Sequence, residues 1–500
     1  MKKIFLAAGC WLLVTGLSAQ TITTKLQKAF QQFENDPQLK HAISSLYVID
    51  AKTGKVVFDK NSQVGLAGAS TQKIITATTA FELLGKDYRY KTQFIKRKDL
   101  HVDYGHNDGE LVVQGNGDPT FGSQRYESTK VQNIFLNVLG NLQNQNFNRV
   151  ERIVVPAYVN QSNPLPGGYC WEDIGNYYGA GTFSLDWREN QYDLLLKSTR
   201  ENGSPPEIVG TEPEQKDMIF YNFLSTGERG SGDNAYIYSV PFSKEITVRG
   251  TIPPNQEKFI IAGSMPNPAK TFAEEFYKFL VTNSIAFRDT LGIDGKLTYF
   301  DDSILIKRDF TDYKDMISYM VSYPLYKYDT IYTHYSPSLD SIIYWFLKKS
   351  INLYGEALIK TFAYEKKARL NDKVGQGVGS TDSGVVIVKD FWKQKGLDET
   401  ELNICDGSGL SPLNRITTHA QVEVLKYAKT RDWFPYFYDA LPEYNNMKMK
   451  SGTINGVKGF AGYQTSKSGD EYIFSFLVNN YNGSPSELVD KMYKVLNNLK

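Results

Sequence analysis

Residues 65–73 read Gly65-Leu66-Ala67-Gly68-Ala69-Ser70-Thr71-Gln72-Lys73 and lead directly into an apolar segment, residues 74–84. The small residues predict a flexible loop, and the Ala- and Leu-rich segment predicts a helix that ends near Gly85. Residues three apart share one face of a helix, so we expect the Lys73 ammonium beside the Ser70 hydroxyl. Main-chain N–H groups at a helix start favour developing negative charge nearby. The spacing therefore indicates an activated nucleophile at Ser70, although Ser-x-x-Lys alone also fits an ordinary helix cap.

The composition argues against several classes of function. The chain has 500 residues, 41% of them hydrophobic, which suffices for a large core and two or three domains. Lys and Arg number 56 against 55 Asp and Glu, and neither charge forms a dominant block. The charge balance therefore suggests neither a nucleic-acid partner nor binding to an anionic membrane surface.

The N-terminus has the pattern of an export signal. Lys2 and Lys3 precede an apolar run at residues 4–17, and Leu17-Ser18-Ala19 is a suitable cleavage site. The run is too short for a comfortable spanning helix. We therefore expect residues 1–19 to be a cleaved signal peptide, followed by an exported chain without a transmembrane segment.

Few residues are available for metal or disulfide chemistry. Signal cleavage would leave Cys170 and Cys405, each expected to be a small buried side chain, with a single bridge between them left open. The five histidines form no His-Glu-x-x-His pair and no Cys/His cluster. The glycines fit neither a phosphate loop nor a dinucleotide-binding pattern. We therefore predict a site without a metal or an organic cofactor.

The order of predicted elements indicates an interrupted domain. A helix to about residue 35 and a hairpin at residues 45–59 precede the Ser70 loop. Short alternating strands between Gly- and Pro-rich turns then dominate up to Pro324, with one helix at about residues 268–283. Beyond Pro324 the pattern becomes helical again, and it ends in strands and a last helix. The expected later elements are helices at 339–347, 353–364 and 385–394, strands at 449–454, 457–465 and 472–479, and a helix through 488–496.

Two further stretches suit a lysine-assisted serine. Ser350-Ile351-Asn352 places a hydroxyl and an amide two residues apart at the start of a helical segment. Lys450-Ser451-Gly452-Thr453 places a cation and two hydroxyls on a predicted strand. Each motif is weak alone, and the two together with Ser70 and Lys73 form a more specific set because of their order, separation and structural settings.

With these motifs the sequence resembles the penicillin-recognising serine D-Ala-D-Ala carboxypeptidases, and most closely their low-molecular-mass class C group. The resemblance spans nearly the whole chain after the signal. It departs at Ile351, where the family often has Asp, and at Ser451, where it usually has Thr. Further matching segments are Gly115-Asn116-Gly117-Asp118-Pro119, Trp171-Glu172-Asp173, Tyr178-Gly179-Ala180, Gly250-Thr251-Ile252-Pro253, Asn267-Pro268-Ala269 and Asp406-Gly407-Ser408-Gly409-Leu410-Ser411.

The resemblance implies the fold and the domain order. It implies an α/β (α+β) serine transpeptidase/β-lactamase-like catalytic domain, in which helices flank an antiparallel sheet, with large inserted β-rich domains. Residues 20–88 and 325–500 would form the catalytic domain. Residues 89–180 and 265–324 would form an inserted domain II, and residues 181–264 a nested domain III.

The resemblance also implies the chemistry. The implied catalytic residues are Ser70, Lys73 and Ser350, and the implied substrate-binding residues are Asn352, Lys450, Ser451 and Thr453. Burial and the charge of Lys450 are expected to lower the pKa of Lys73. The loop from Asp406 to Ser411 is expected to be a structural turn at the border of the site, and Asp118 and Trp171 are expected to be structural.

The implied substrates are peptidoglycan stem peptides ending in D-Ala-D-Ala, with β-lactams as inhibitors, in the periplasm or cell envelope. Endopeptidase action on cross-links is open beside carboxypeptidase action. Two alternatives also remain open. One is a β-lactamase or esterase on the same scaffold, and the other is a catalytically inactive envelope protein that binds peptidoglycan.

Overall fold

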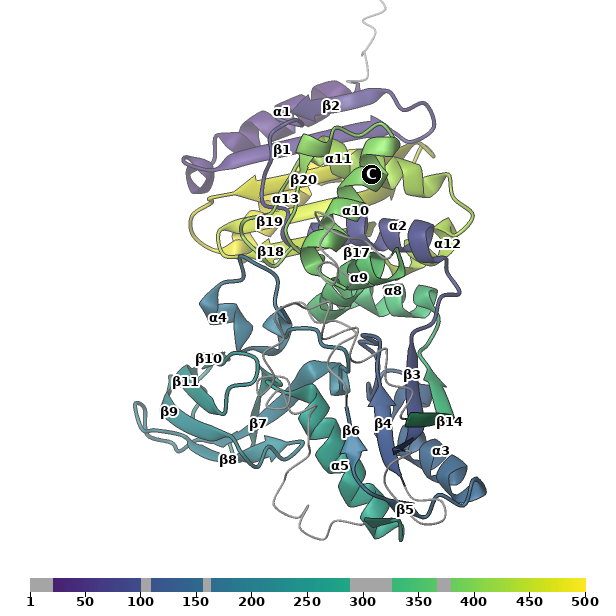
Figure 1. Ribbon diagram of the computed structural model, residues 1–500. Helices are drawn as coiled ribbons and strands as arrows, with labels where there is room; N and C mark the ends of the chain where they lie inside the picture. Colours follow the sequence, from purple (N-terminus) through teal and green to yellow (C-terminus); the bar gives the residue numbers. More distant parts are fainter. Residues whose placement is uncertain (1–20, 100–108, 156–162, 288–325, 367–378) are drawn as a thin grey trace, which may run out of the picture.

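A six-stranded antiparallel sheet joins the two ends of the chain (Figure 1). The computed structural model describes residues 21–99, 109–155, 163–287, 326–366 and 379–500, so the expected signal peptide lies outside the described residues. The N-terminal hairpin pairs with the C-terminal strands, with Ile43 opposite Asn479. In spatial order the strands are β17 (Glu443–Tyr444), β18 (Met447–Ile454), β19 (Val457–Thr465), β20 (Glu471–Asn479), β1 (Ile43–Asp50) and β2 (Val56–Lys60).

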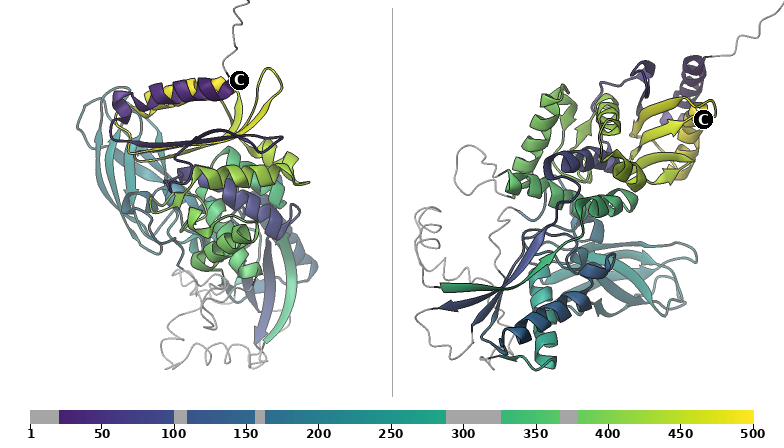
Figure 2. Two further views of the ribbon diagram at one scale, coloured as in Figure 1. Left: turned by 90° about the horizontal axis from the view of Figure 1, so that it is seen from above. Right: turned by 90° about the vertical axis from the view of Figure 1, so that its right-hand side faces the viewer.

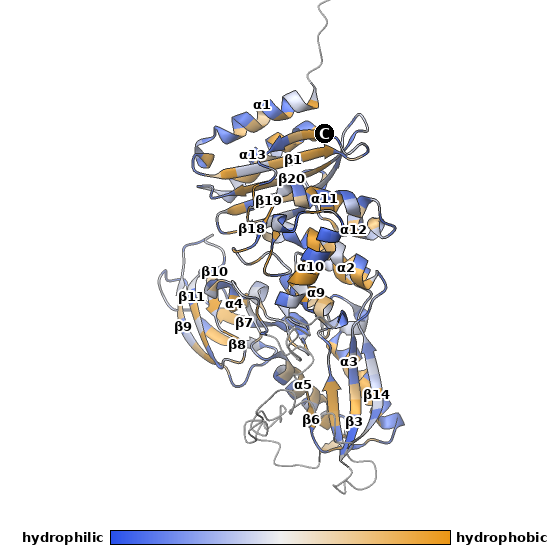
Figure 3. Ribbon diagram, turned by 45° about the horizontal axis from the view of Figure 1, so that its top comes forward, coloured by the Kyte–Doolittle hydropathy of each residue, from blue (hydrophilic) through white to orange (hydrophobic). Residues whose placement is uncertain are grey.

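Both faces of this sheet are covered by helices. Alternate residues of a strand point to opposite faces, and accordingly Tyr47 and Ile49 join one hydrophobic core whereas Leu46 and Val48 join another. The central strands β1 and β20 are consequently buried along most of their length, whereas α1 is polar on its outer side (Figure 3). The second core is closed by α1 (Ile22–Glu34) and α13 (Pro485–Leu496).

The helices on the other face bury the segment that begins at Lys73. They are α2 (Lys73–Leu84), α8 (Leu339–Lys348), α9 (Asn352–Glu365), α10 (Thr381–Gln394), α11 (Thr418–Lys429) and α12 (Phe434–Ala440). Helix α2 is buried all round, from Lys73 through Phe81, as expected for a central helix with an apolar surface on every side. The predicted helices and strands of the chain ends are confirmed within a few residues, whereas α11 and α12 were not predicted.

The middle of the chain is connected to the N- and C-terminal parts through two adjacent strands. Strand β3 (Lys91–Asp99) pairs antiparallel with β14 (Tyr326–Tyr335), which leads into α8. A four-stranded sheet in the order β14-β3-β4-β6 packs with two helices around a separate core. The remaining members are β4 (Glu110–Gln114), β6 (Ile153–Val154), α3 (Val131–Asn144) and α5 (Pro268–Thr282).

A smaller β-rich unit lies beside this sheet. Two three-stranded sheets, in the orders β10-β11-β9 and β12-β7-β8, share a fourth hydrophobic core. Both inserted units lie beyond α8 and α9, on the side opposite α1 and α13 (Figures 1 and 2). The strands are β7 (Gln191–Lys197), β8 (Glu207–Glu212), β9 (Ile219–Thr226), β10 (Asn234–Tyr238), β11 (Glu245–Ile252) and β12 (Phe259–Ser264).

Candidate active site

A tight turn in front of α2 presents Ser70. The turn is a 3-10 helix, Ala69–Gln72, so Ser70 precedes the α-helix, whereas the sequence predicted it at the start of the α-helix itself. Ala69 has φ 46°, a left-handed conformation that non-glycine residues seldom adopt and that clusters at functional sites. The Thr71 hydroxyl donates to the Gly68 carbonyl at 2.6 Å and closes the turn.

Strand β18 passes directly against this turn at Gly452. A Cβ atom on Gly452 would lie 3.0 Å from the Ser70 nitrogen, 2.9 Å from the Thr71 nitrogen and 2.5 Å from the Gly68 oxygen. These are main-chain atoms and cannot swing aside as the end of a flexible side chain can. The absence of a side chain therefore permits the close approach of the strand to the turn that carries Ser70.

Lys73 is fully buried beside Ser70. Its Nζ lies 2.9 Å from Ser70 Oγ, which confirms the predicted proximity. Nζ also donates to Asn352 Oδ1 at 2.6 Å and to the Ser408 carbonyl at 2.7 Å. Both of these oxygens are acceptors only and so occupy two of the Nζ protons. When the amine is neutral, its lone pair is left to face the Ser70 hydroxyl, which can donate to it.

Burial changes the acidity of both lysines. The loss of water around Lys73 lowers its pKa from 10.5 to about 7, against the opposing effect of the Asp406 and Glu356 carboxylates. Burial also lowers the pKa of Lys450 well below its ordinary value, and the charge of Lys73 is the second cause. The predicted lowering of the Lys73 pKa by burial is confirmed, whereas the charge of Lys450, which was also expected to lower it, is not among the causes.

The second motif begins helix α9. Asn352 joins two segments, because its Oδ1 accepts from Lys73 and its Nδ2 donates to the Tyr178 carbonyl at 2.8 Å. Ser350 precedes the helix with φ 57°. Its hydroxyl forms no hydrogen bond with the part of the chain that the structure describes. The structure therefore brings Asn352 into contact with Lys73 and leaves Ser350 on the cleft wall.

The third motif lies on β18, whose alternation separates its members. Lys450 is buried and its Nζ donates to the Ser451 carbonyl at 2.9 Å. Thr453 is exposed, and its Oγ1 accepts from Lys458 Nζ at 2.7 Å. Ser451 is half-buried. Of the three, Thr453 lines the cleft, and Lys450 lies behind the surface near Lys73.

A cleft of about 990 Å³ opens over these motifs. Ser70, Ser350, Asn352 and Thr453 line it together with Leu410 and Pro412. The inserted region supplies the facing wall, which carries both charges and aromatic rings. Its members are Arg125, Cys170, Glu172, Asp173, Tyr177, Tyr178, Gln191 and Tyr236. The cleft therefore lies between two parts of the chain that are distant in sequence.

Sequence reasoning missed contacts made by main-chain atoms. The carbonyls of Ser408 and Tyr178 hold Lys73 and Asn352, and a carbonyl leaves no trace in the amino-acid type. The loop that carries Ser408 is held by Asp406, whose carboxylate accepts from the Gly409 and Ser411 nitrogens, both at 2.7 Å. The loop thus borders the site, as predicted, and it also contacts the lysine directly.

Three expectations outside the motifs can be compared with the structure. Cys170 and Cys405 are both free. Cys170 is exposed and Cys405 is half-buried, so the expectation that each is buried was wrong. The exposure of Cys170 comes from its position on the cleft wall. Asp118 is buried and accepts from the Thr120 nitrogen and hydroxyl. Trp171 is exposed, with its ring 6.1 Å from that of Tyr238.

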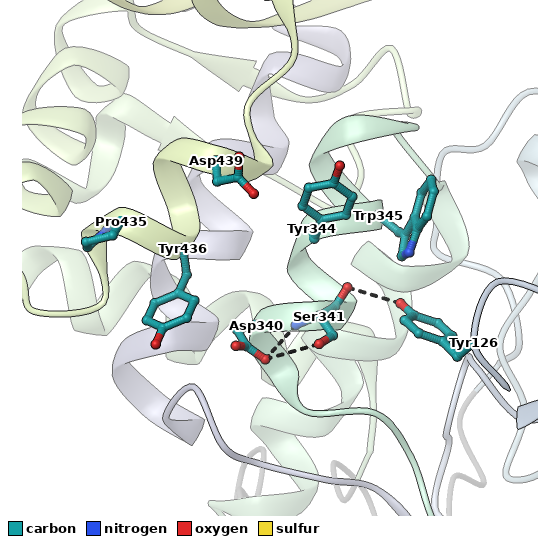
Figure 4. Close-up of a pocket in the computed structure, with 8 residues that line it drawn as sticks. All are labelled: Tyr126, Asp340, Ser341, Tyr344, Trp345, Pro435, Tyr436 and Asp439. Atoms are coloured by element: carbon teal, nitrogen blue, oxygen red, sulfur yellow. Dashed lines mark hydrogen bonds between the residues drawn. The ribbon is translucent and has the colours of Figure 1, made fainter. Parts of the chain in front are cut away.

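A second pocket, of about 460 Å³, lies between α8 and α12 (Figure 4). Aromatic side chains and two carboxylates surround it, and the Tyr126 hydroxyl donates to the Ser341 carbonyl at 3.1 Å. Its lining residues are Tyr126, Asp340, Ser341, Tyr344, Trp345, Pro435, Tyr436 and Asp439. None of the predicted catalytic or substrate-binding residues lines this pocket, whereas four of them line the cleft over Ser70.

Comparison with known proteins agrees with this geometry over nearly the whole chain. The sequence model of one peptidase family matches residues 26–323 and 320–499. The chain belongs to the D-Ala-D-Ala carboxypeptidase 3 (S13) family. The implied class of serine-type D-Ala-D-Ala carboxypeptidase is thereby confirmed.

Curated relatives of this family cover most of the chain. A D-alanyl-D-alanine carboxypeptidase of Actinomadura sp. (strain R39) is 23% identical over 93% of this chain and 82% of its own length. The D-alanyl-D-alanine carboxypeptidase DacB of Haemophilus influenzae is 22% identical over 85% of this chain and 83% of its own length.

A solved structure agrees with the fold. Penicillin binding protein 4 (dacB) of Haemophilus influenzae superposes with a TM-score of 0.71 at 16% identity, over 95% of this chain and 98% of that one. The same protein in complex with a β-lactam superposes with a TM-score of 0.67. The implied transpeptidase/β-lactamase-like fold with inserted β-rich regions is confirmed. Among the described residues, every helix is too short or too polar to cross a membrane.

Proposed function

We propose that Ser70 of this S13 carboxypeptidase attacks the carbonyl between the two terminal D-alanines of a peptidoglycan stem peptide. The observation that carries the proposal is the contact of 2.9 Å between Ser70 Oγ and the buried Lys73 Nζ. A hydroxyl is a weak nucleophile until a base takes its proton. Lys73, with a pKa of about 7, can serve as that base near neutral pH.

The reaction proceeds in two steps. In the first, Lys73 takes the Ser70 proton while Oγ bonds to the peptide carbonyl carbon. The C–N bond then breaks, and the proton passes from Lys73 through the Ser350 hydroxyl to the leaving D-alanine amine. In the second step, water hydrolyses the ester on Ser70, releases the shortened peptide and returns the proton to the serine.

Main-chain N–H groups stabilise the negative charge that develops on the substrate oxygen. The N–H groups of Ser70 and Thr453 are the proposed oxyanion donors. The tight approach at Gly452 supports the pairing, because it holds the strand against the nucleophile turn. Loss of one such donor in other acyl-transfer enzymes costs about 3 kcal/mol of transition-state stabilisation.

The remaining motif residues bind the substrate. Lys450, behind the cleft surface, supplies a positive charge for the terminal carboxylate, because the negative charge of that carboxylate favours the ammonium form against the effect of burial. The hydroxyls of Ser451 and Thr453 donate to the same carboxylate. Asn352 binds the substrate amide and also holds Lys73. Penicillins acylate Ser70 because their strained amide is presented to the same nucleophile.

The proposed setting is the cell envelope, most specifically the periplasm, after removal of residues 1–19. We also propose the predicted division into a catalytic domain and two inserted domains. Separate hydrophobic cores in the corresponding parts of the chain support this division.

The test is incubation with purified disaccharide pentapeptides, followed by mass spectrometry of the products. The expected product has lost one alanine, and cross-linked dimers report any endopeptidase action in the same sample. The Ser70→Ala variant is the control for contaminating peptidase. Rapid penicillin turnover without D-alanine release would indicate the β-lactamase alternative, and neither activity in the folded protein would indicate the inactive scaffold.

A further inference from the structure

Helix α9 carries three polar residues at intervals of four, namely the half-buried Asn352 and the buried Glu356 and Lys360. Residues four apart lie on one face of a helix. Asn352 contacts Lys73, whereas Lys360 Nζ donates to main-chain carbonyls of the inserted region, including that of Thr182 at 3.1 Å. Glu356, between them, has no part in the proposed reaction.

Glu356 holds the loop on which Lys73 depends. Its Oε1 accepts from the Ser408 nitrogen at 2.9 Å, and its Oε2 accepts from the Gly407 nitrogen at 3.1 Å. The carbonyl of the same Ser408 accepts from Lys73 Nζ at 2.7 Å. One residue of the loop is thus fixed on its N–H side by Glu356 and contacts the catalytic amine on its carbonyl side.

Glu356 also reaches the inserted region. The Tyr169 hydroxyl donates to Glu356 Oε1 at 3.0 Å and lies 3.3 Å from Ser408 Oγ. Tyr169 belongs to the segment that carries Cys170 and Tyr178 on the cleft wall. The carboxylate therefore joins the helix, the loop and the inserted wall at one buried point.

We propose that Glu356 is a positioning residue for the general base, because it fixes the Ser408 carbonyl against Lys73 and anchors the inserted wall through Tyr169. This inference rests on the proposed role of Lys73. Displacement of a reacting group by about 1 Å can cost on the order of 100-fold in rate. Loss of the Glu356 anchor is expected to affect acylation even though Glu356 does not contact the nucleophile.

The charge of Glu356 gives a second, electrostatic effect. Burial raises the pKa of Glu356 to about 7, so the carboxyl group, whose oxygens accept from two main-chain N–H groups, is ionised above neutral pH. Its negative charge favours the ammonium form of Lys73 and so raises the pKa of that lysine against the effect of burial. The other titratable groups around Glu356 are Asp406, Tyr169, Lys360 and Cys405.

The test compares Glu356→Gln with Glu365→Gln on the same helix. Glu365 is exposed and accepts from the Tyr88 hydroxyl at 2.8 Å. It is therefore also a carboxylate that accepts from a tyrosine, but it does not contact the loop that carries Ser408. The rate constant for acylation by a fluorescent penicillin is measured from pH 5 to 9, and the thermal midpoint is measured in parallel. Penicillin labelling of the unsubstituted protein at Ser70 tests the proposed function separately, because it does not depend on the role of Glu356.

We expect Glu356→Gln to slow acylation at pH 8 by roughly 10- to 100-fold. The acid limb of its pH profile should move to lower pH, because the carboxylate no longer favours protonated Lys73. Glu365→Gln should match the unsubstituted protein in both respects. A folded Glu356→Gln variant with unchanged rate and unchanged acid limb would overturn the proposal.

A second variant keeps the proposal testable if Glu356→Gln does not fold. Tyr169→Phe removes one donor to the carboxylate and leaves both loop contacts. It is expected to slow acylation by roughly 3- to 10-fold, at the magnitude of a single hydrogen bond, while the protein remains folded. No change in rate for Tyr169→Phe, in the absence of a folded Glu356→Gln, would overturn the proposal.

Discussion

The pH dependence of acylation follows from the environment of Lys73. Only the neutral amine can take the Ser70 proton, and the pKa of Lys73 is lowered to about 7. The neutral fraction is therefore about 1% at pH 5, about half at pH 7 and about 90% at pH 8. The acylation rate constant should rise about tenfold per pH unit below pH 7 and become constant above about pH 8. An ordinary lysine would leave roughly 0.03% neutral at pH 7 and extend the rise beyond pH 9.

Stopped-flow measurement with a fluorescent penicillin gives this rate constant directly. The intrinsic fluorescence of the protein at each pH shows that it remains folded. Lys73→Arg is the matched control, since a guanidinium stays protonated across the whole range and cannot act as the base. We expect this variant to be slower by about 1000-fold, within the range of about 100- to 10,000-fold that a general base contributes.

Two results would refute the reasoning. A rate that is constant between pH 5 and pH 8 would mean that no group with a pKa near 7 controls acylation. The Glu356 carboxyl provides the second check, because burial raises its pKa to about 7 as well. Complete loss of the acid limb in Glu356→Gln would assign the limb to that carboxyl and contradict the role of Lys73 as base.

Three substitutions test the other contacts. Asn352→Ala removes the acceptor 2.6 Å from Lys73 Nζ. Because a hydrogen bond to a charged group is worth about 1.5–3 kcal/mol, acylation should slow by roughly 10- to 100-fold. An unchanged rate would contradict a role of this contact in acylation. Gly452→Ala forces a Cβ against main-chain atoms of Gly68, Ser70 and Thr71, so we expect a free energy of unfolding about 1–3 kcal/mol lower and loss of penicillin labelling. Gly140→Ala, in α3 with open space at its Cβ, is the control and should retain the stability and the labelling of the unsubstituted protein. Lys450→Met should raise KM at least about tenfold for peptides with a free terminal carboxylate but have little effect on the KM for amidated peptides. Lys448→Met, on the same strand, is the control. Equal effects on both substrates would exclude a role of Lys450 in binding the terminal carboxylate.

The proximity of Ser70 and Lys73 could be predicted because their relation is local. Ser70 and Lys73 are three residues apart, and helical geometry alone brings them together. The N-terminal hairpin was likewise predictable from a turn between two short apolar runs. Burial of Lys73 was harder to predict, because it depends on α2 lying at the centre of the helical layer.

The rest of the site depends on contacts that no short pattern encodes. Ser408 is 335 residues from Lys73 in the sequence, and it contributes its main-chain carbonyl. Glu356 resembles any charged residue on a helix until the fold buries it against the loop. Cys170 looked like a small buried side chain because its type favours burial, and the cleft between the inserted wall and α9 is what exposes it.

The most direct test of the account is to locate the covalent adduct of benzylpenicillin by mass spectrometry of the digested protein. The account predicts one adduct, on the peptide that contains Ser70, and its complete loss in a folded Ser70→Ala variant. An adduct on another residue, or one that persists in Ser70→Ala, would contradict the assignment of Ser70 as the nucleophile.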